Sequence, residues 1–398
     1  MSVTGAFKTT PTAALEVVLN IPPLELKAQQ FAQNSWYRLL RTGAVTHHCH
    51  FDHKIHQMLI KSTEVCIQPA DFTQRTLIFP NVNIQFTYPS KESWLEDQFD
   101  TQKYDICAYT DGSSNELGVG AGIFIWPENE MADYDNPNQN IHIPLSNTTT
   151  VFQTEMLAIS TAAHLLLHNV NKHIAILSDS LSAIQSLENP EIRPITKLDC
   201  INNINKIAVA NQLALIWVPG HSGIQGNERA DELANTGAAV EYIGPSPIPP
   251  IPLSFVKSKT KEWMTDQSTL KWRCAQKFKG TKEFLNLIDM TSLHTIPYLQ
   301  KPLLTYTINT ITGHGSFRSH LVKLKLSDEP SCPYCGSIQD TNIHYVYHCP
   351  KFTKNRHFSM FQPKPPLDNN NCNQKPNKRI KVSELWDFIR SSQRFDMA

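Results

Sequence analysis

Residues 106–126 read ICAYTDGSSNELGVGAGIFIW, two apolar runs on either side of the polar segment DGSSNELG. The apolar runs 106–109 and 119–126 predict two strands joined by a turn. Further strands are predicted at 141–145, 174–177 and in LALIWV, with helices at 151–168, 180–187, 196–210 and 225–238. The order βββαβααβα predicts an α/β domain over residues 103–240, with a mixed five-stranded sheet and flanking helices.

Four acidic residues occupy positions in this pattern that suit metal chemistry. Asp111 and Asp179 each follow a predicted strand, Glu155 lies near the start of the 151–168 helix, and Asp231 lies inside the last helix. Strand ends and helix starts of such sheets gather at one edge of the fold. Carboxylates converging there would repel one another without a cation between them, and hard oxygen ligands select Mg²⁺ or Mn²⁺. Two such ions, about 3.5–4 Å apart, can clamp an in-line displacement at phosphorus.

Each of these acids also has an ordinary explanation when it is taken alone. Asp111 and Asp179 are in positions where Asp often caps a helix or turn, and Glu155 and Asp231 are compatible with solvated helix positions. The joint pattern favours the metal site over these explanations. His221 precedes Asp231 on a Gly-rich segment that predicts a mobile loop, where an imidazole can transfer protons.

These residues resemble the motifs of the type-1 RNase H family. The motifs are TDGS at 110–113, TE at 154–155, SDS at 178–180 and PGHSGIQGNERADELA at 219–234. The resemblance implies a ribonuclease H that hydrolyses the RNA strand of an RNA–DNA hybrid, cutting internally with two Mg²⁺ or Mn²⁺ ions. It implies that the four acids bind these ions and that His221 is the mobile histidine. It also implies substrate contacts from these residues: Gly112, Ser113, Ser180 and Asn227.

The flanking segments resemble the C-terminal part of arthropod non-LTR retrotransposon polyproteins. The resemblance lies in TTPTAALEVVLNIPPLELKAQQFAQNSWYRL at 9–39, SKESW at 90–94, TGHGSF at 312–317 and SELWDFIRSSQRF at 383–395. No aromatic-x-Asp-Asp polymerase motif occurs in the sequence. The resemblance therefore implies a retrotransposon-derived chain without a reverse transcriptase, whose mostly helical residues 1–100 are a remnant of the connection that follows one. A truncated copy and a domesticated gene both fit this origin.

Pro-rich and polar segments predict where the remaining parts begin and end. GPSPIPPIP at 244–252 cannot continue a helix and predicts a linker, and residues 362–382 predict a flexible one. A helical, zinc-knuckle-like region is expected at 253–361 and a terminal helix at 383–395. Residues 1–250 hold 14 Lys+Arg and 25 Asp+Glu, a net charge of −11, whereas the rest holds 22 and 11, a net of +11. The basic C-terminal part is a candidate surface for single-stranded nucleic acid, although a solvated Lys-rich surface has the same composition.

A cysteine–histidine cluster predicts a zinc site in the C-terminal region. CPYCGSIQDTNIHYVYHC supplies Cys332, Cys335, His344 and Cys349, four N/S ligands suited to a closed tetrahedral Zn²⁺ site. His348 is an alternative ligand, and His344 is preferred because its register resembles the retrotransposon tails. The site could serve nucleic-acid binding or protein interaction, or could be purely structural.

Other features set limits on location and partners. No apolar run approaches the length of a membrane span, and the N-terminus lacks a signal-peptide pattern, so an intracellular location, nuclear or cytoplasmic, is expected. HHCHFDHKIH at 47–56 invites a metal interpretation, but a polar loop fits its crowded spacing better. Three functions are therefore compared: an active hybrid-specific endoribonuclease, a catalytically unused nucleic-acid-binding remnant, and an interaction module built on the zinc segment.

Overall fold

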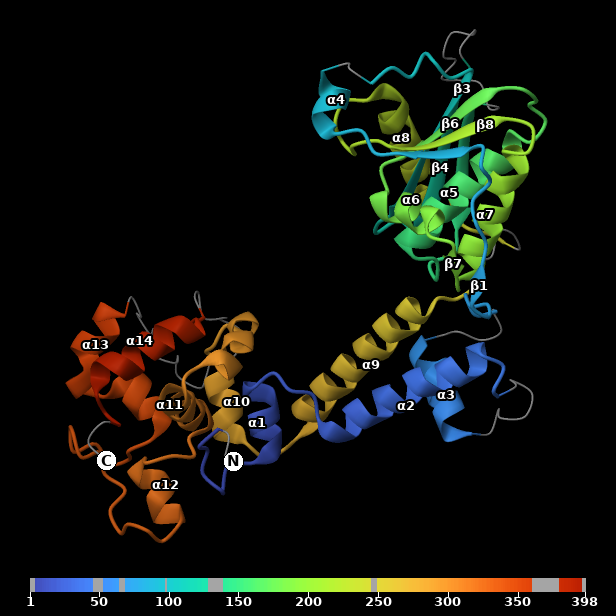
Figure 1. Ribbon diagram of the computed structural model, residues 1–398. Coiled ribbons are helices and arrows are strands. Elements are labelled where there is room, and N and C mark those ends of the chain that lie inside the picture. The colour runs from blue at the N-terminus through green and yellow to red at the C-terminus, as the bar shows by residue number, and fades with distance from the viewer. Residues whose placement is uncertain are drawn as a thin grey trace. The chain divides into compact units, whose positions relative to one another are not determined.

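The computed structural model describes residues 4–45, 53–63, 69–96, 99–127, 139–244, 249–359 and 379–395. The chain forms two compact units (Figure 1). One unit is Gln29–Glu262, and the other combines Met1–Ala28 with Trp263–Ala398. Residues 1–100 are thus divided between the two units.

A six-stranded mixed sheet forms the centre of the first unit, in the order β2-β8-β6-β3-β4-β5. Its strands are β2 (Ile84–Thr87), β3 (Ile106–Ser114), β4 (Val119–Pro127), β5 (Asn140–Leu145), β6 (His173–Ser178) and β8 (Gln212–Trp217). β3, β4 and β5 pair antiparallel, whereas β3, β6, β8 and β2 pair parallel. The mixed α/β architecture predicted from the sequence is confirmed.

The prediction of five strands was wrong by one. The additional strand is β2, which pairs parallel with β8 in the register Thr87↔Ile216. It comes from residues 1–100, which were expected to be mostly helical. An unpaired β8 would leave a row of backbone donors and acceptors exposed at the edge of the sheet, and β2 covers that edge.

Helices cover both faces of the sheet, because alternate strand residues point to opposite sides. One face packs against α5 (Val151–Leu165), α6 (Leu181–Glu188) and α7 (Ile195–Ile207). The other packs against α8 (Gln225–Ala239) and against Trp94 of α4 (Lys91–Leu95). Buried aliphatic side chains fill both layers, and this burial is the main stabilising contribution.

Two glycines let α8 approach the sheet closely. A Cβ added at Gly122 would lie 2.1 Å from the Ala230 carbonyl oxygen, and one added at Gly120 would lie 2.2 Å from the Ala238 amide nitrogen. Both contacts are with helix backbone, which cannot move aside as a flexible side chain can. Residues of the GAG sequence at 120–122 therefore fix the position of α8, and with it the position of Asp231.

The segments that flank the α/β domain are bound to it by specific contacts. The flanking helices are α2 (Leu24–Arg41), α3 (Lys54–Thr63) and α9 (Leu253–Cys274), and a short strand β1 (Thr76–Leu77) pairs antiparallel with β7 (Glu191–Ile192). The Asp71 carboxylate accepts hydrogen bonds from the Thr196 amide at 2.9 Å and from the Gln153 side chain at 3.1 Å. Tyr37 donates to the Ile251 carbonyl at 2.7 Å.

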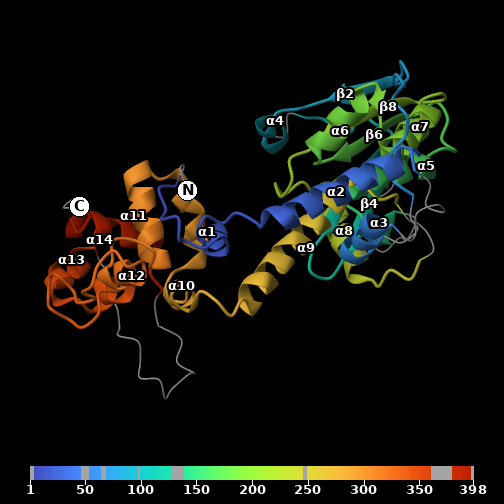
Figure 2. The ribbon, with the colours of Figure 1, turned by 90° about the horizontal axis from the view of Figure 1, so that it is seen from below.

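The second unit is helical, and its helices group together in both views (Figures 1 and 2). They are α1 (Thr12–Val18), α10 (Lys279–Leu285), α11 (Lys301–Thr312), α12 (Arg318–Lys323), α13 (Thr353–Phe358) and α14 (Val382–Ser392), with short turns η2 (Met290–Tyr298), η3 (His344–His348) and η4 (Pro350–Phe352). Aromatic side chains dominate the core, among them the fully buried Tyr345, Phe317 and Phe388. Among the described residues, no helix has both the length and the apolar character required to cross a bilayer.

A buried ion pair ties the end of the chain to this core. Arg394 and Asp340 lie 2.6 Å apart, with side chains that are 3% and 0% exposed. The Arg394 guanidinium also lies over the rings of Phe317, Tyr334 and Tyr345. Leaving either charge of such a pair alone in the core would cost several kcal/mol, on the order of 3–5.

Candidate active site

The parallel pairing of β3 and β6 brings two of the predicted acids together. Thr110 pairs with Ser178, so Asp111 and Asp179 follow equivalent positions on neighbouring strands. The Thr110 hydroxyl donates to the Leu177 carbonyl at 3.0 Å and joins the two strands at this point. Asp111 is buried and Asp179 is half-buried.

Helix α5 adds Glu155 to the same edge. The helix begins with a capping box, in which Thr150 and Gln153 satisfy each other's backbone amides. Its first turn packs against β3 so closely that a Cβ at Gly112 would lie 2.9 Å from the Glu155 amide nitrogen. Glu155 is 5% exposed, and its Oε2 atom is buried without a hydrogen-bond partner among the described residues.

The structure brings all four predicted acids to one site in two groups. One carboxylate oxygen from each of Asp111, Glu155 and Asp179 lies within 4.8 Å of the others. Asp231 lies within the same limit of His221 and Glu228. The negative charge of Asp231 also raises the pKa of both Asp111 and Asp179, so the two groups are electrostatically connected.

Glu228 was not singled out from the sequence. It lies three residues before Asp231 on α8, and residues at that spacing share one face of a helix. This spacing was the available signal. It was easily missed because an acid in the first turn of a helix usually serves the helix dipole.

Burial and mutual repulsion destabilise the ionised forms of these carboxyl groups. Burial, followed by the charges of Asp179 and Asp231, raises the pKa of Asp111 to about 7. Burial, followed by the charges of Asp111 and Asp179, raises the pKa of Glu155 to about 9. Without a cation, Glu155 therefore retains its proton near neutral pH, and Asp111 is about half protonated at pH 7. The orphaned Glu155 oxygen and this oxygen-rich ligand set fit a divalent cation such as Mg²⁺.

His221 lies on a strained, exposed loop beside these acids. Its φ angle is +47°, in the left-handed region that non-glycine residues rarely adopt. The preceding Gly220 is so close to the acids that an added Cβ would lie 2.6 Å from Asp179 Oδ2. The charge of His221 lowers the pKa of Asp179, although burial makes the net shift upward.

The predicted substrate residues differ in their accessibility. Ser113 is partly exposed and donates to Asn235 Oδ1 at 2.7 Å, while Asn235 donates to Asp231 at 2.9 Å. Ser180 is also partly exposed at the start of α6. Asn227 is only 2% exposed, and its Oδ1 has no partner among the described residues, so its side chain faces the interior.

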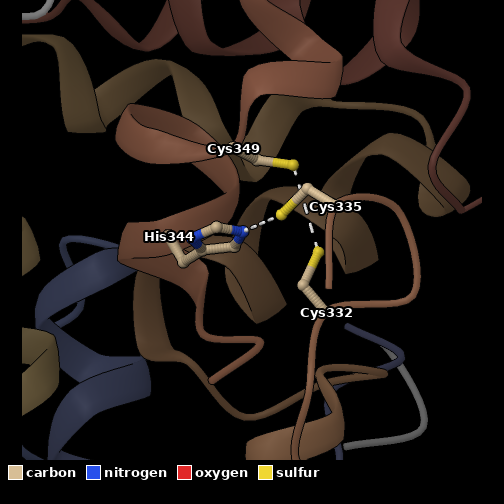
Figure 3. Close-up of side chains that lie close together, drawn as sticks. All are labelled: Cys332, Cys335, His344 and Cys349. Atoms are coloured by element: carbon tan, nitrogen blue, oxygen red, sulfur yellow. Dashed lines mark hydrogen bonds between the residues drawn. The ribbon is translucent and has the colours of Figure 1, made fainter. Parts of the chain in front are cut away.

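The predicted zinc ligands also lie together, in the second unit. Figure 3 shows Cys332, Cys335, His344 and Cys349 with their ligand atoms facing one another, all within 4.8 Å. The Cys332 and Cys349 sulfur atoms are 4.0 Å apart, and Cys335 Sγ lies 3.3 Å from His344 Nε2. Two thiolates bound to one tetrahedral zinc ion would lie roughly 3.8 Å apart, so small shifts would accommodate the ion. The alternative ligand His348 is exposed and outside the group.

The histidine-rich segment at 47–56 lies partly outside the described residues. Of its histidines, His53 stacks on Trp36, with ring centroids 4.5 Å apart. His56 is buried and accepts a hydrogen bond from the Trp36 indole at 3.1 Å. These two histidines thus pack against a helix, which is their observed structural role.

The fold and the site define an α/β domain with a mixed sheet and a cluster of carboxylates beside the paired strands β3 and β6. Residues 103–239 match the RNase H family model. The chain is 32% identical to the ribonuclease H of Schizosaccharomyces pombe over 148 residues, which are 33% of this chain and 52% of the relative. It is 26% identical to the ribonuclease H of Francisella philomiragia over 148 residues, or 35% of this chain and 94% of the relative.

A shorter match, 44% identical over 52 residues, relates the chain to the ribonuclease H of Cupriavidus necator and covers 13% of this chain and 34% of that protein. The chain spans about half the length of the Schizosaccharomyces relative. Residues 103–239 therefore form an RNase H domain. β2, α4 and the β1 strand lie outside this matched region.

The raised pKa values predict how pH affects stability when no metal is bound. Glu155 and Asp111 hold protons in the folded chain at pH values where the unfolded chain has lost them. Their stabilisation is complete below about pH 4 and is lost as the pH rises through about 7 and 9. In EDTA, we expect the melting temperature to fall between about pH 5 and pH 9.

Glu155→Gln should flatten this decrease in melting temperature with pH. Glu232→Gln, which changes an exposed acid on α8, should leave the decrease unchanged. Added Mg²⁺ should raise the melting temperature more at high pH than at low pH, because the ion binds the ionised carboxylates. Parallel pH profiles for Glu155→Gln and the unmodified protein would contradict the assigned pKa shifts.

Proposed function

We propose that this chain is a metal-dependent endoribonuclease that cleaves the RNA strand of RNA–DNA hybrids. The observation that carries the proposal is the convergence of Asp111, Glu155 and Asp179 within 4.8 Å at the edge of an RNase H domain. Such a crowded set of buried carboxyl groups destabilises a fold unless bound cations offset the repulsion between the ionised groups. The names of the relatives support the activity, and the hybrid substrate follows from the family.

The four acids would hold two Mg²⁺ or Mn²⁺ ions. When bound, these ions supply an activated water and offset the charge that develops at the scissile phosphate. Asp111 and Glu155 would lose their protons on loading and, together with Asp179, present oxygen ligands. Asn235 would hold the Asp231 carboxylate in place through its 2.9 Å hydrogen bond.

The remaining residues would position substrate and move protons. His221, exposed on its loop, would accept or deliver a proton at an imidazole nitrogen during product release. Ser113, Ser180 and the backbone near Gly112 would contact phosphates at the mouth of the site. Asn227 would contact the substrate through its backbone, or through its side chain once that buried group becomes accessible.

The flanking sequence motifs support an origin from a retrotransposon polyprotein. In that account, the chain holds the nuclease and the C-terminal region of the ancestor. The basic C-terminal part would contact single-stranded nucleic acid, and Zn²⁺ would stabilise its fold through Cys332, Cys335, His344 and Cys349. A chain that binds hybrids without cleaving them is the second candidate, and the same assay separates the two.

The nuclease proposal predicts selective, metal-dependent cleavage. Purified protein should cut a labelled RNA–DNA hybrid in Mg²⁺, but not in EDTA, and should leave single-stranded and duplex RNA intact. Asp179→Asn should reduce the rate by on the order of 10²–10³-fold, because it removes one charged ligand. Glu232→Gln, which alters an exposed acid next to Asp231, should keep full activity. Binding without cleavage would favour the second candidate, and unchanged cleavage by Asp179→Asn would sink the mechanism.

The zinc proposal predicts a defined metal content. Cys335→Ser should lower the zinc content of the purified chain by one equivalent, because three ligands hold Zn²⁺ much less tightly than four. It should also lower the melting temperature of the second unit. Cys274→Ser is the matched control, because Cys274 is exposed and outside the cluster. Equal zinc content in the Cys335→Ser and unmodified proteins would refute the site.

A further inference from the structure

Four arginines gather on one surface of the first unit, and we call them the arginine cluster: Arg38, Arg41, Arg75 and Arg193. Residues 1–250 contain five arginines, so this cluster holds all but one of them. The same stretch of sequence has a net charge of −11, from 14 basic and 25 acidic residues. A local group of cations on an otherwise acidic part of the chain therefore needs a physical explanation.

Strand pairing brings two members of the cluster together. β1 pairs antiparallel with β7 in the register Leu77↔Glu191, which places β1 beside the connection between α6 and α7 (Figure 1). Glu191 binds Arg75 at 3.0 Å through one carboxylate oxygen and Arg193 at 2.9 Å through the other. The two arginine side chains remain 64% and 56% exposed. One carboxylate thus neutralises only half of their charge.

The other two members come from the last turn of α2. The Arg41 guanidinium lies 4.5 Å from the centroid of the Phe72 ring, and its Nε is buried without a hydrogen-bond partner among the described residues. Burial lowers the pKa of Arg41, and the positive charges of Arg38 and Arg193 lower it further. The Thr73 amide donates to the Arg193 carbonyl at 2.6 Å and joins this segment to Arg193.

Nearby acids do not neutralise Arg38 and Arg41. Within the described part of the chain, neither forms an ion pair with a carboxylate. The nearby Asp71 accepts hydrogen bonds from Thr196 and Gln153, and burial raises its pKa. The cluster therefore carries a net positive charge that an external anion would stabilise.

Helix α6 connects the cluster to the acidic centre. It begins two residues after Asp179 and ends at Glu188, three residues before Glu191. An eight-residue helix is roughly 12 Å long, so the path from Asp179 along α6 is on the order of 20 Å including the flanking residues. At about 3.4 Å per base-pair step, this path sets an upper limit of roughly six steps along a nucleic-acid duplex.

We propose that the arginine cluster binds the phosphate backbone of the RNA–DNA hybrid several base pairs from the cleavage site. This proposal rests on the proposed nuclease function and assigns part of its substrate binding to segments outside the RNase H domain. Arg38, Arg41 and Arg75 come from the N-terminal flank, and only Arg193 belongs to residues 103–239. Guanidinium groups suit this ligand because their planar donors match phosphate oxygens.

The test measures hybrid binding in EDTA, so that it does not depend on cleavage. Fluorescence anisotropy would follow full-length protein with a labelled hybrid of about 18 base pairs and with one of about 6, over a series of salt concentrations. The double variant Arg75→Gln/Arg193→Gln should bind the long hybrid roughly three- to tenfold more weakly. Its plot of log Kd against log salt should be shallower by about one for each lost phosphate contact. Binding of the short hybrid should be nearly unaffected.

Glu191→Gln provides a test in the opposite direction. Removing the shared carboxylate should tighten binding of the long hybrid and steepen its salt dependence, a gain that loss of structure cannot produce. Lys206→Gln is the matched control, because it removes an exposed cation at the far end of α7. This variant should bind like the unmodified protein. Equal affinity and equal salt slope in all four proteins would overturn the proposal.

The result is separable from that of the nuclease assay. If hybrids are cleaved but these variants bind alike, only the arginine cluster assignment is wrong. If cleavage is absent and the affinities still change as described, the phosphate-binding surface stands and the nuclease function fails.

Discussion

Crowding of buried carboxyl groups at one sheet edge is the constraint on which the rest of this structure depends. Asp111, Glu155 and Asp179 place oxygens within 4.8 Å, and burial together with mutual repulsion raises the pKa of each. That arrangement opposes folding when the groups are ionised and becomes favourable when a divalent cation replaces the protons. A side chain at Gly112 would meet the backbone of α5, and one at Gly220 would meet the Asp179 carboxylate.

Much of this site could be predicted because its determinants are local. Apolar runs identify β3 and β6, and the two acids lie together because Asp111 is the first residue of β3 beyond its pairing with β6, while Asp179 directly follows β6. The pairing of β2 with β8 could not be predicted, because IQFT at 84–87 is short and the pairing joins residues more than a hundred positions apart. The β1–β7 pairing was missed for the same reason. Spacing alone did not decide between His344 and His348. The register of the resemblance favoured His344, and the fold places His344 with the three cysteines and leaves His348 exposed.

The flanking segments are structural parts of their units, and this widens the functional account beyond the RNase H domain. The Asp71 carboxylate caps α7 and also binds Gln153 of α5, so a residue from the N-terminal flank holds two helices of the nuclease fold. In the other unit, the Arg394–Asp340 pair fixes Arg394, near the end of the chain, to Asp340, which lies between Cys335 and His344 of the cysteine–histidine cluster in sequence. Charged residues therefore have two different roles here. The buried Arg394–Asp340 pair specifies packing, and the arginine cluster, only partly neutralised by Glu191, would bind an anion.

The most direct test of the central claim is the number of protons released when metal binds. Isothermal titration calorimetry of Mn²⁺ binding at about pH 7, repeated in buffers with different ionisation enthalpies, measures this number. Because the pKa of Glu155 is raised to about 9 and that of Asp111 to about 7, binding should release on the order of one proton or more per chain. Binding heats that do not depend on the buffer, or no binding, would contradict the account of a protonated carboxylate centre that loads divalent cations.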